Sequence, residues 1–225
     1  MNEIIIYDDS YGSIETIERL GEEFKKEKFI YFCDDLAYPL AMRKSSDEII
    51  EVRQEELTKM DPKIIAYPNL GRIVVYPKSE NRVINLDLDG FKDMTVLGDS
   101  KNYYGFTDYI DSQFLVNQGM NRNEYILKEL IKEYLKDSKE KVFLNNTTLC
   151  LFRKYFAELK GDREIYYLND YFYEKLVEVI KENEWIIKFG GKVSCYVTEN
   201  RLKFAEVFEE FTGKKIYPSL YRERD

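Results

Sequence analysis

Short apolar runs rich in β-branched residues alternate along the chain with longer stretches of helical spacing. Residues 4–7 and 29–32 are two such runs, and each has the length of a buried strand. Between them, hydrophobic side chains recur three or four positions apart from Ile14 to Phe24, and Ser13 stands where a helix cap is expected. This order predicts a parallel β-α-β unit, whose ligands would lie beyond the carboxyl ends of its strands.

The same patterns continue through the rest of the chain. Residues 72–88, RIVVYPKSENRVINLDL, hold two β-rich runs around a polar turn and predict a hairpin. Further strands are predicted over 63–66, 95–97 and 142–144. Helices are predicted from about 47 to 59, over 126–135 and over 204–211.

The stretch from Lys141 to Phe152, KVFLNNTTLCLF, places four small polar residues between an apolar run and a helical pattern. Such a loop can cap the helix, and the remaining backbone N–H groups together with the helix dipole attract anions. The candidate ligand-binding residues of this loop are Asn145, Asn146, Thr147 and Thr148. The alternative is an ordinary helix cap without a ligand.

Acidic pairs follow the first two predicted strands. Asp8 and Asp9 come after the first strand, and Asp34 and Asp35 come after the second. Because parallel strands end at one rim of a sheet, all four are candidate ligand-binding residues. Carboxylates that lie close together must bind water, accept backbone N–H groups or hold a raised pKa. The simpler alternative is that Asp9 and Asp35 only cap turns.

The composition of the chain argues against several classes of function. The net charge of −8, without a long Lys/Arg cluster, argues against nucleic-acid binding. No apolar stretch has the length of a membrane span and no signal-peptide layout is present, so we expect a cytoplasmic protein. The spacing of the three cysteines suggests neither a disulfide framework nor a metal site. Since the chain has no histidine, acid–base chemistry would need carboxylates, thiols, lysines or tyrosines.

Two segments, YDDSYGS at 7–13 and YFCDDLAYPLAMRKSSDEI at 31–49, resemble the cofactor-independent glutamate racemases. Those enzymes carry F-D-S-G-x-G-G, then Y-x-G-D-T-x-x-x-P-Y-G followed by K-S-x-E-E-I. Asp8 and Asp34 match the two motif aspartates, and Pro39 matches the proline. The departures are Asp9 for serine, Cys33 for glycine, and Leu40 and Ala41 for the tyrosine and glycine that cradle the substrate's side-chain carboxylate.

Later segments continue the resemblance in the same order. DREIYYLND at 162–170 is similar to a racemase strand that ends in a short acidic turn, and CYVTENRLKFAEVFEEFTGKKI at 195–216 is similar to the closing segment. The racemase motif with the first catalytic cysteine, A-C-N-T-A-S, aligns with AYPNLG at 66–71, which has no cysteine. The motif L-G-C-T-H-Y-P-L maps onto 144–151, which places Asn146 at the second cysteine and Thr148 at the histidine.

This resemblance implies a diverged glutamate racemase relative that lacks both catalytic cysteines. The implied fold is α/β, with two Rossmann-like domains built on parallel sheets and an inter-domain cleft. We expect residues 1–92 plus 192–225 in the first domain and 93–191 in the second. The leading function is binding of a small acidic metabolite or amino acid in the cleft, without a cofactor, and we allow for a homodimer.

Two alternatives stay open. In the first, the protein is an active enzyme of the same superfamily, in which Asp8 or Cys33 replaces the lost thiol, while Cys150 is expected to face the core. In the second, it is a flavodoxin-like FMN carrier with YDDSYGSIETI at 7–17 as a phosphate loop. The FMN reading leaves the later racemase-like segments unexplained.

Overall fold

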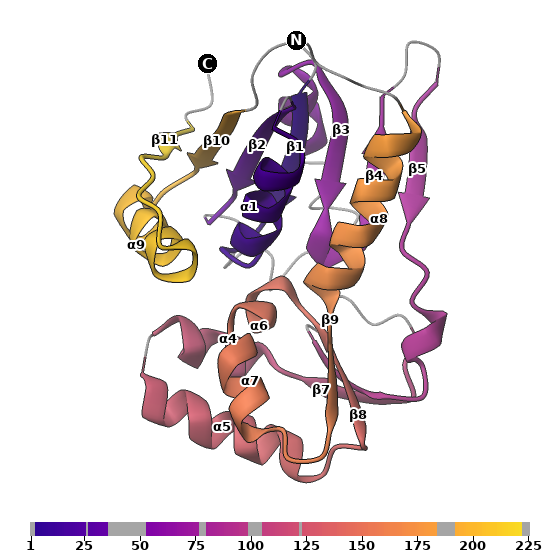
Figure 1. The fold of residues 1–225 in the computed structure, drawn as a ribbon, viewed down its shortest axis with the longest axis vertical. Coiled ribbons are helices and arrows are strands. Elements are labelled where there is room, and N and C mark those ends of the chain that lie inside the picture. The colour runs from indigo at the N-terminus through magenta and orange to yellow at the C-terminus, as the bar shows by residue number, and fades with distance from the viewer. Residues whose placement is uncertain are drawn as a thin grey trace. The chain divides into compact units, whose positions relative to one another are not determined.

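The computed structural model describes residues 3–25, 27–35, 53–76, 80–98, 105–121, 123–183 and 192–221 (Figure 1). Its backbone contacts divide the chain into unit 1, Met1–Leu86 with Asn169–Asp225, and unit 2, Asp87–Leu168. Each unit has its own sheet of mainly parallel strands with helices, which confirms the α/β class. No helix in the described part of the chain combines the length and the apolar character that a membrane crossing requires.

The sheet of unit 1 has seven strands in the order β11-β10-β2-β1-β3-β4-β5. Its parallel part consists of β1 (Glu3–Asp8), β2 (Lys28–Cys33), β3 (Pro62–Tyr67), β10 (Lys192–Val197) and β11 (Ser219–Leu220). The antiparallel part consists of β4 (Arg72–Val75) and β5 (Arg82–Asn85). The hairpin predicted over 72–88 is therefore confirmed as the β4–β5 pair, placed at one edge of the sheet (Figure 1).

The predicted β-α-β unit is formed by β1, α1 (Ile14–Glu23) and β2. The apolar side of α1 is buried, as its helical spacing predicted, and β1 and β2 pair in parallel from Glu3 with Lys28 to Asp8 with Cys33. Ser13 precedes α1 but makes no side-chain cap, and its hydroxyl instead donates a short hydrogen bond to Asp8. The expected cap is wrong because the buried carboxylate takes that hydroxyl as a donor.

Two further helices, α8 (Leu168–Glu182) and α9 (Arg201–Thr212), complete unit 1. The acidic turn expected at the end of 162–170 is absent, since α8 begins directly after the preceding strand. Arg19 of α1 pairs with Asp170 of α8, and Tyr173 of α8 donates to Glu23. These contacts tie α8 to α1 of unit 1, whereas the sequence-based boundaries at 92 and 191 assign it to the second domain.

Parts of two predicted features lie outside the described residues. Of the helix expected over 47–59, residues 53–58 are helical, and the preceding positions are not described. The racemase-like positions Pro39, Leu40 and Ala41 also lie outside the described residues.

Unit 2 is built on four parallel strands in the order β7-β6-β8-β9. The strands are β6 (Thr95–Gly98), β7 (Asp108–Asp111), β8 (Lys141–Asn145) and β9 (Glu164–Tyr167). Its helices are α4 (Gln113–Met120), α5 (Glu124–Lys136), α6 (Thr147–Leu151) and α7 (Arg153–Leu159). Phe143 of the central strand β8 stacks on Phe91 with ring centroids 4.0 Å apart, and this pair anchors the apolar core of the unit.

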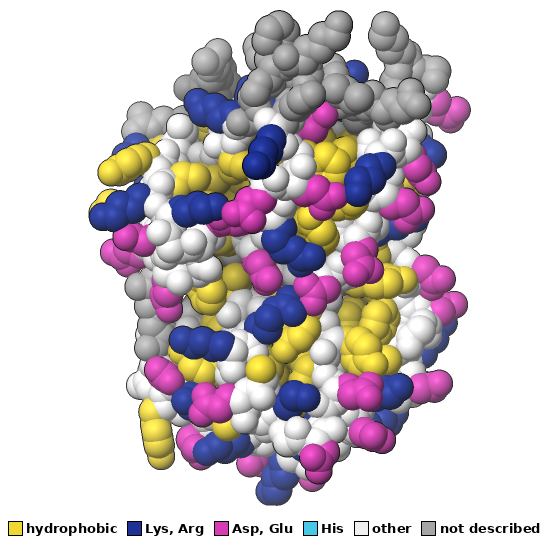
Figure 2. Space-filling model, in the orientation of Figure 1, with side chains coloured by type: hydrophobic (Ala, Val, Ile, Leu, Met, Phe, Trp, Pro, Cys, Tyr) yellow, Lys and Arg dark blue, Asp and Glu magenta, His cyan; other side chains and the backbone are white. Residues whose placement is uncertain are grey.

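Lys and Arg side chains alternate with Asp and Glu over the face shown in Figure 2. No extended basic area is visible among the described residues of that face.

Gly119 offers a test of packing between α4 and the residues after α6. A Cβ atom added there would lie 2.2 Å from the buried ring of Phe152. We expect Gly119→Ala to lower the free energy of unfolding by about 1–3 kcal/mol in urea denaturation, although alanine favours helices. The matched control is Gly90→Ala, where an added Cβ meets nothing within 4 Å. Equal stability of the two variants would contradict the packing.

Candidate functional site

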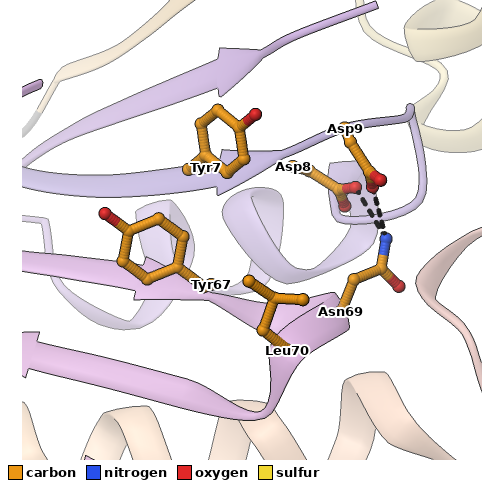
Figure 3. Close-up of a pocket in the computed structure, with 6 residues that line it drawn as sticks. All are labelled: Tyr7, Asp8, Asp9, Tyr67, Asn69 and Leu70. Carbon is orange, nitrogen blue, oxygen red and sulfur yellow. Dashed lines mark hydrogen bonds between the residues drawn. The ribbon is translucent and has the colours of Figure 1, made fainter. Parts of the chain in front are cut away.

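Asp8 lies at the carboxyl end of β1 and is 1% exposed. Its carboxylate accepts hydrogen bonds from the Ser10 backbone N–H at 3.0 Å, the Ser10 hydroxyl at 2.9 Å and the Ser13 hydroxyl. The amide nitrogen of Asn69 donates to Asp8 at 3.2 Å and to Asp9 at 2.8 Å (Figure 3). Asn69 is placed by the short turn of Pro68–Leu70 that follows β3. The first acidic pair is thus held by the loops after two neighbouring strands.

A small cavity of about 20 Å³ adjoins this pair. It is lined by Tyr7, Asp8, Asp9, Tyr67, Asn69 and Leu70 (Figure 3). This volume matches one water molecule, or one ammonium group of similar size, and a whole small-molecule site typically has ~300–1,000 Å³. The Tyr67 hydroxyl points away from the two carboxylates and has no hydrogen-bond partner among the described residues.

Asp34 follows β2 and is fully buried. Arg53 contacts both of its carboxylate oxygens, with Nε at 2.6 Å from one and a terminal nitrogen at 3.4 Å from the other. The hydroxyls of Tyr7 and Thr198 each donate to Asp34 at 3.1 Å. A buried charge is stable only with such partners, so this group holds the ends of β1, β2 and β10 together.

Asp35 binds the loop between β10 and α9. It accepts the backbone N–H groups of Glu199 and Asn200 at 2.8 and 2.7 Å, and the Thr198 hydroxyl at 2.8 Å. Tyr11 donates to the same carboxylate at 3.4 Å. These contacts correspond to the capping role that was the alternative for Asp35, here exerted on a loop distant in sequence.

Cys33, the thiol candidate at the end of β2, is fully buried. Its Sγ lies 3.2 Å from the backbone oxygen of Ser10, to which the thiol donates. Burial and then the nearby carboxylates, led by Asp35 and Asp8, raise the pKa of Cys33 well above its usual value. The group therefore stays a neutral thiol at physiological pH, and a neutral thiol is a weak nucleophile and base.

The other two cysteines are also buried. Cys195 lies in β10, where burial raises its pKa to about 12. Cys150 lies in α6, with its Sγ 3.3 Å from the backbone oxygen of Asn146, and its expected position in the core is confirmed. None of the three forms a disulfide.

In unit 2, the loop after β8 caps α6. The side-chain oxygen of Asn146 accepts the backbone N–H groups of Thr148 at 2.9 Å and Leu149 at 3.3 Å. Asn145, Asn146, Thr147 and Thr148 are all buried. Because α6 has five residues and Asn146 occupies two of its first N–H groups, the helix dipole attracts an anion less than a long helix would.

Ser112, which follows β7, bonds to the last residue of β6. The Ser112 hydroxyl and backbone N–H both bond to the Gly98 oxygen, at 2.9 and 2.8 Å. A Cβ on Gly98 would lie 3.1 Å from the backbone oxygen of Asn145, so the loops after β6 and β8 pack closely. Among the described residues of this rim, the ends of β6 and β8 carry amides and hydroxyls, and β7 ends in the carboxylate of Asp111.

The structure joins the predicted aspartates into one rim within unit 1. The backbone N–H of Asp34 donates to the backbone oxygen of Asp8 at 2.8 Å, and the Tyr7 hydroxyl links β1 to the Asp34 carboxylate. The loop 145–148 belongs to unit 2, and its sharing of a ligand with Asp8 stays a prediction. No group of three His, Cys, Asp or Glu side chains suited to a metal ion occurs among the described residues.

Sequence reasoning missed three residues of this rim: Arg53, Asn69 and Thr198. Asn69 lies two residues after β3 and Thr198 directly follows β10, so the strand-end rule that selected the aspartates points to them once these strands are known. Arg53 lies within a predicted helix, and helical spacing alone does not single out one charged residue as the partner of a buried carboxylate.

Comparisons with known proteins give a fold. No protein-family model matches the chain, and no curated protein sequence matches it significantly. A glutamate racemase isoform from Bacillus anthracis superposes with a TM-score of 0.71 at 12% identity, covering 99% of this chain and 98% of that one. The Thermus thermophilus glutamate racemase in complex with beta-chloro-D-alanine has a TM-score of 0.72 at 11% identity, covering 98% and 96%.

The Francisella tularensis glutamate racemase in complex with D-glutamate has a TM-score of 0.71 at 15% identity, covering 98% of this chain and 97% of that one. The chain has the glutamate racemase fold. This confirms the fold implied by the sequence motifs. At such low identity the likeness concerns the fold alone. Within this racemase fold, β3 ends in Tyr67 and β8 in Asn145.

The buried ion pair of this racemase-fold chain can be tested by removing one partner. Asp34→Ala leaves Arg53, 14% exposed at its side chain, with Glu56 as a remaining partner at 2.9 Å. We expect urea denaturation to show a loss of about 3 kcal/mol in the free energy of unfolding. Glu182→Ala is the control, since its pair with Arg82 is half-exposed and should contribute less than about 1 kcal/mol. A similar small loss for both variants would refute the buried network.

The raised pKa of Cys33 predicts alkaline destabilisation. The unfolded chain loses this proton near pH ~8.5 and the folded chain keeps it, so the thiol's contribution is present below that pH and lost as pH rises. Between about pH 8.5 and 10, Cys33→Ala should reduce the fall in unfolding free energy by up to ~1.4 kcal/mol per pH unit. The control Ile30→Val should change stability and leave the slope unaltered. An unchanged slope in Cys33→Ala would count against the buried thiol.

Proposed function

We propose that this racemase-fold protein binds an amino acid and does not racemise it with two thiols. The observation that carries the proposal is the chemistry of the two strand ends where the family motifs carry cysteine. Tyr67, Pro68 and Asn69 follow β3, and Asn145 and Asn146 follow β8. Amides cannot exchange an α-proton, and the raised pKa of buried Tyr67 keeps its phenol protonated.

The carboxylate rim of unit 1 suits a positively charged group. Asp8 and Asp9 share the donor Asn69 beside a cavity of about 20 Å³, which corresponds to an ammonium group. A ligand carboxylate there would face Asp8, Asp9, Asp34 and Asp35. Arg53, the cation seen at this rim, already contacts Asp34 and Glu56. An α-ammonium is therefore favoured here over the second carboxylate of an acidic metabolite.

The rim of unit 2 suits the other end of the ligand. Its residues 145–148 and Ser112 carry neutral amide and hydroxyl groups, and such groups bind a carboxylate without adding a like charge. The proposed ligand is a zwitterion that bridges the two rims in an inter-domain cleft. Two of the racemase structures were determined in complexes with D-glutamate and with beta-chloro-D-alanine, which supports amino acids as the ligand class.

The competing readings have less support. An active enzyme based on Asp8 or Cys33 would need a base, but Asp8 is buried among four donors and Cys33 is a neutral thiol. An FMN carrier would need a β1–α1 loop that faces a phosphate with open donors. In this loop the hydroxyls of Ser10 and Ser13 bind the Asp8 carboxylate instead.

Thermal denaturation with a panel of L- and D-amino acids tests binding. At equal concentration a neutral amino acid should raise the melting temperature more than glutamate or a dicarboxylate without an amino group, because the stabilisation grows with the ratio of ligand concentration to Kd. Asp9→Asn should abolish that shift, and the exposed Asp89→Asn should retain it. The same mixtures in D₂O should show no exchange of the α-proton by NMR.

Each outcome has a separate meaning. A shift produced by dicarboxylates and unaffected by Asp9→Asn would overturn the ammonium site. Rapid α-proton exchange that survives removal of Cys33 and Cys150 would overturn the absence of catalysis and point to carboxylate or tyrosine bases.

A further inference from the structure

Asn169 lies in the first turn of α8 and is fully buried. Its side-chain nitrogen donates to the backbone oxygen of Gly12 at 2.9 Å, although the two residues are 157 positions apart in the sequence. Gly12 belongs to the segment 9–13 between β1 and α1, which we call the β1–α1 loop. Figure 1 shows α8, in orange, with its first turn at the end of unit 1 toward which the arrow of β3 points. The hydrogen bond thus connects α8 with the loop that follows Asp8.

Hydrogen bonds lead from Asn169 to the carboxylates of the candidate site. The Gly12 backbone N–H donates to the Ser10 hydroxyl at 3.2 Å, and that hydroxyl donates to Asp8 at 2.9 Å. Asp8 in turn shares a donor with its neighbour in the first acidic pair. Because Gly12 is bonded at both its oxygen and its nitrogen, a shift of this residue changes the position of the group that holds the Ser10 hydroxyl.

The β1–α1 loop has a second anchor on β2. The Ser10 backbone oxygen accepts hydrogen bonds from the Tyr31 hydroxyl at 2.9 Å and from the Cys33 thiol at 3.2 Å. These contacts hold the first half of the loop, and Asn169 holds the second half at Gly12. With only one of the two anchors left, the loop should open more often.

The oxygen of the Asn169 side chain is buried and has no hydrogen-bond partner among the described residues. An unpaired buried acceptor lowers stability. Leucine, of similar volume, would remove this acceptor but would leave the Gly12 oxygen without its donor, so the two residues should give similar stability. Stability alone therefore does not require asparagine at this position. Its distinct contribution is the donor that fixes Gly12.

We propose that Asn169 is a positioning residue, which holds the β1–α1 loop in the form that binds the amino acid. This inference rests on the proposed function and adds a residue of α8 to it. Asn169 acts through the loop and does not contact the ligand. Its amide fixes Gly12, Gly12 holds the Ser10 hydroxyl, and this hydroxyl keeps the Asp8 carboxylate in place beside the cavity. Groups that are fixed before binding lose less free energy in being ordered by the ligand.

Calorimetric titration with L- and D-alanine measures the effect on binding. Asn169→Leu should raise Kd for the enantiomer that binds by about three- to tenfold, as expected for one hydrogen bond, with little change in urea denaturation. The matched control is Asn183→Leu, just after the end of α8. Asn183 makes the same kind of bond, from its side-chain nitrogen to the Val179 oxygen at 2.6 Å. This control should keep the wild-type Kd.

Asn169→Asp separates the hydrogen bond from packing, since the two side chains have nearly the same shape. An ionised carboxylate cannot donate to Gly12 and repels its oxygen, whereas the protonated form can donate, and burial raises the pKa of the introduced carboxyl. The ratio of the variant's Kd to the wild-type Kd should exceed about ten at pH ~8 and approach one as the pH is lowered to ~5. Wild-type protein at each pH corrects for titration of the first acidic pair and of Asp170, which pairs with Arg19. A ratio independent of pH overturns the proposal.

Cys33 reports the state of the loop without a ligand. Its buried thiol donates to the Ser10 oxygen, so more frequent opening of the loop should speed its alkylation by iodoacetamide. We expect a rate at least about three times faster in Asn169→Leu and the wild-type rate in Asn183→Leu, with the modified peptide identified by mass spectrometry. If alanine binds the wild-type protein, an unchanged Kd in Asn169→Leu overturns the positioning role. If alanine does not bind it, the proposed function fails for this ligand, and an unchanged rate at Cys33 overturns the positioning of the loop.

Discussion

Burial of two carboxylates, Asp8 and Asp34, at the carboxyl ends of β1 and β2 determines how the loops around them are arranged. An unpaired charge in this position would be strongly destabilising, so each carboxylate collects donors from distant parts of the chain. The Asp8 carboxylate accepts hydrogen bonds from Ser10, Ser13 and Asn69. The Asp34 carboxylate accepts hydrogen bonds from Arg53, Tyr7 and Thr198. The loop after β1, the turn after β3 and the loop after β10 are therefore fixed by the same need.

This arrangement also sets the chemistry of the rim. The carboxylates that order the loops surround Cys33 and, together with its burial, hold its thiol neutral. Tyr7 and Tyr31, which lie on β1 and β2, have pKa values raised first by burial and then by nearby aspartates. A rim of this composition attracts a cation and holds its potential thiol and phenol bases protonated. Its electrostatics therefore favour recognition of an ammonium group over abstraction of a proton.

The parts of the fold that follow from local patterns could be predicted from the sequence. The apolar runs at 4–7, 29–32 and 142–144 are strands, and residues 72–88 form a hairpin. The extent of helix after Asn146 was not predictable, because α6 ends after five residues where Phe152 packs against Gly119. That contact is between residues far apart in the sequence, which periodicity does not encode.

The candidate site divides in the same way. The strand-end rule identified the aspartates from the sequence, and the order of the racemase-like motifs predicted the fold. Neither indicated which hydrogen-bond donors would pair with each carboxylate. Ser13 shows the difference: the local pattern favours a helix cap, and the buried charge of Asp8 takes its hydroxyl instead. Tertiary electrostatics outweighed a local preference there because an unsatisfied buried carboxylate costs more than a missing cap, which is ~1 kcal/mol.

In the proposed amino-acid site, the two members of the first acidic pair would consequently have different roles. Asp8 is buried and its donors come from the loop that it organises, so displacing any of them would disturb β1 and α1 together. Asp9 is half-buried and meets the Asn69 amide at the edge of the small cavity. An arriving ammonium group can contact Asp9 without displacing the hydroxyls bound to Asp8. Asp8 thus positions the loop, while in the proposed site Asp9 would supply the charge that the ligand meets.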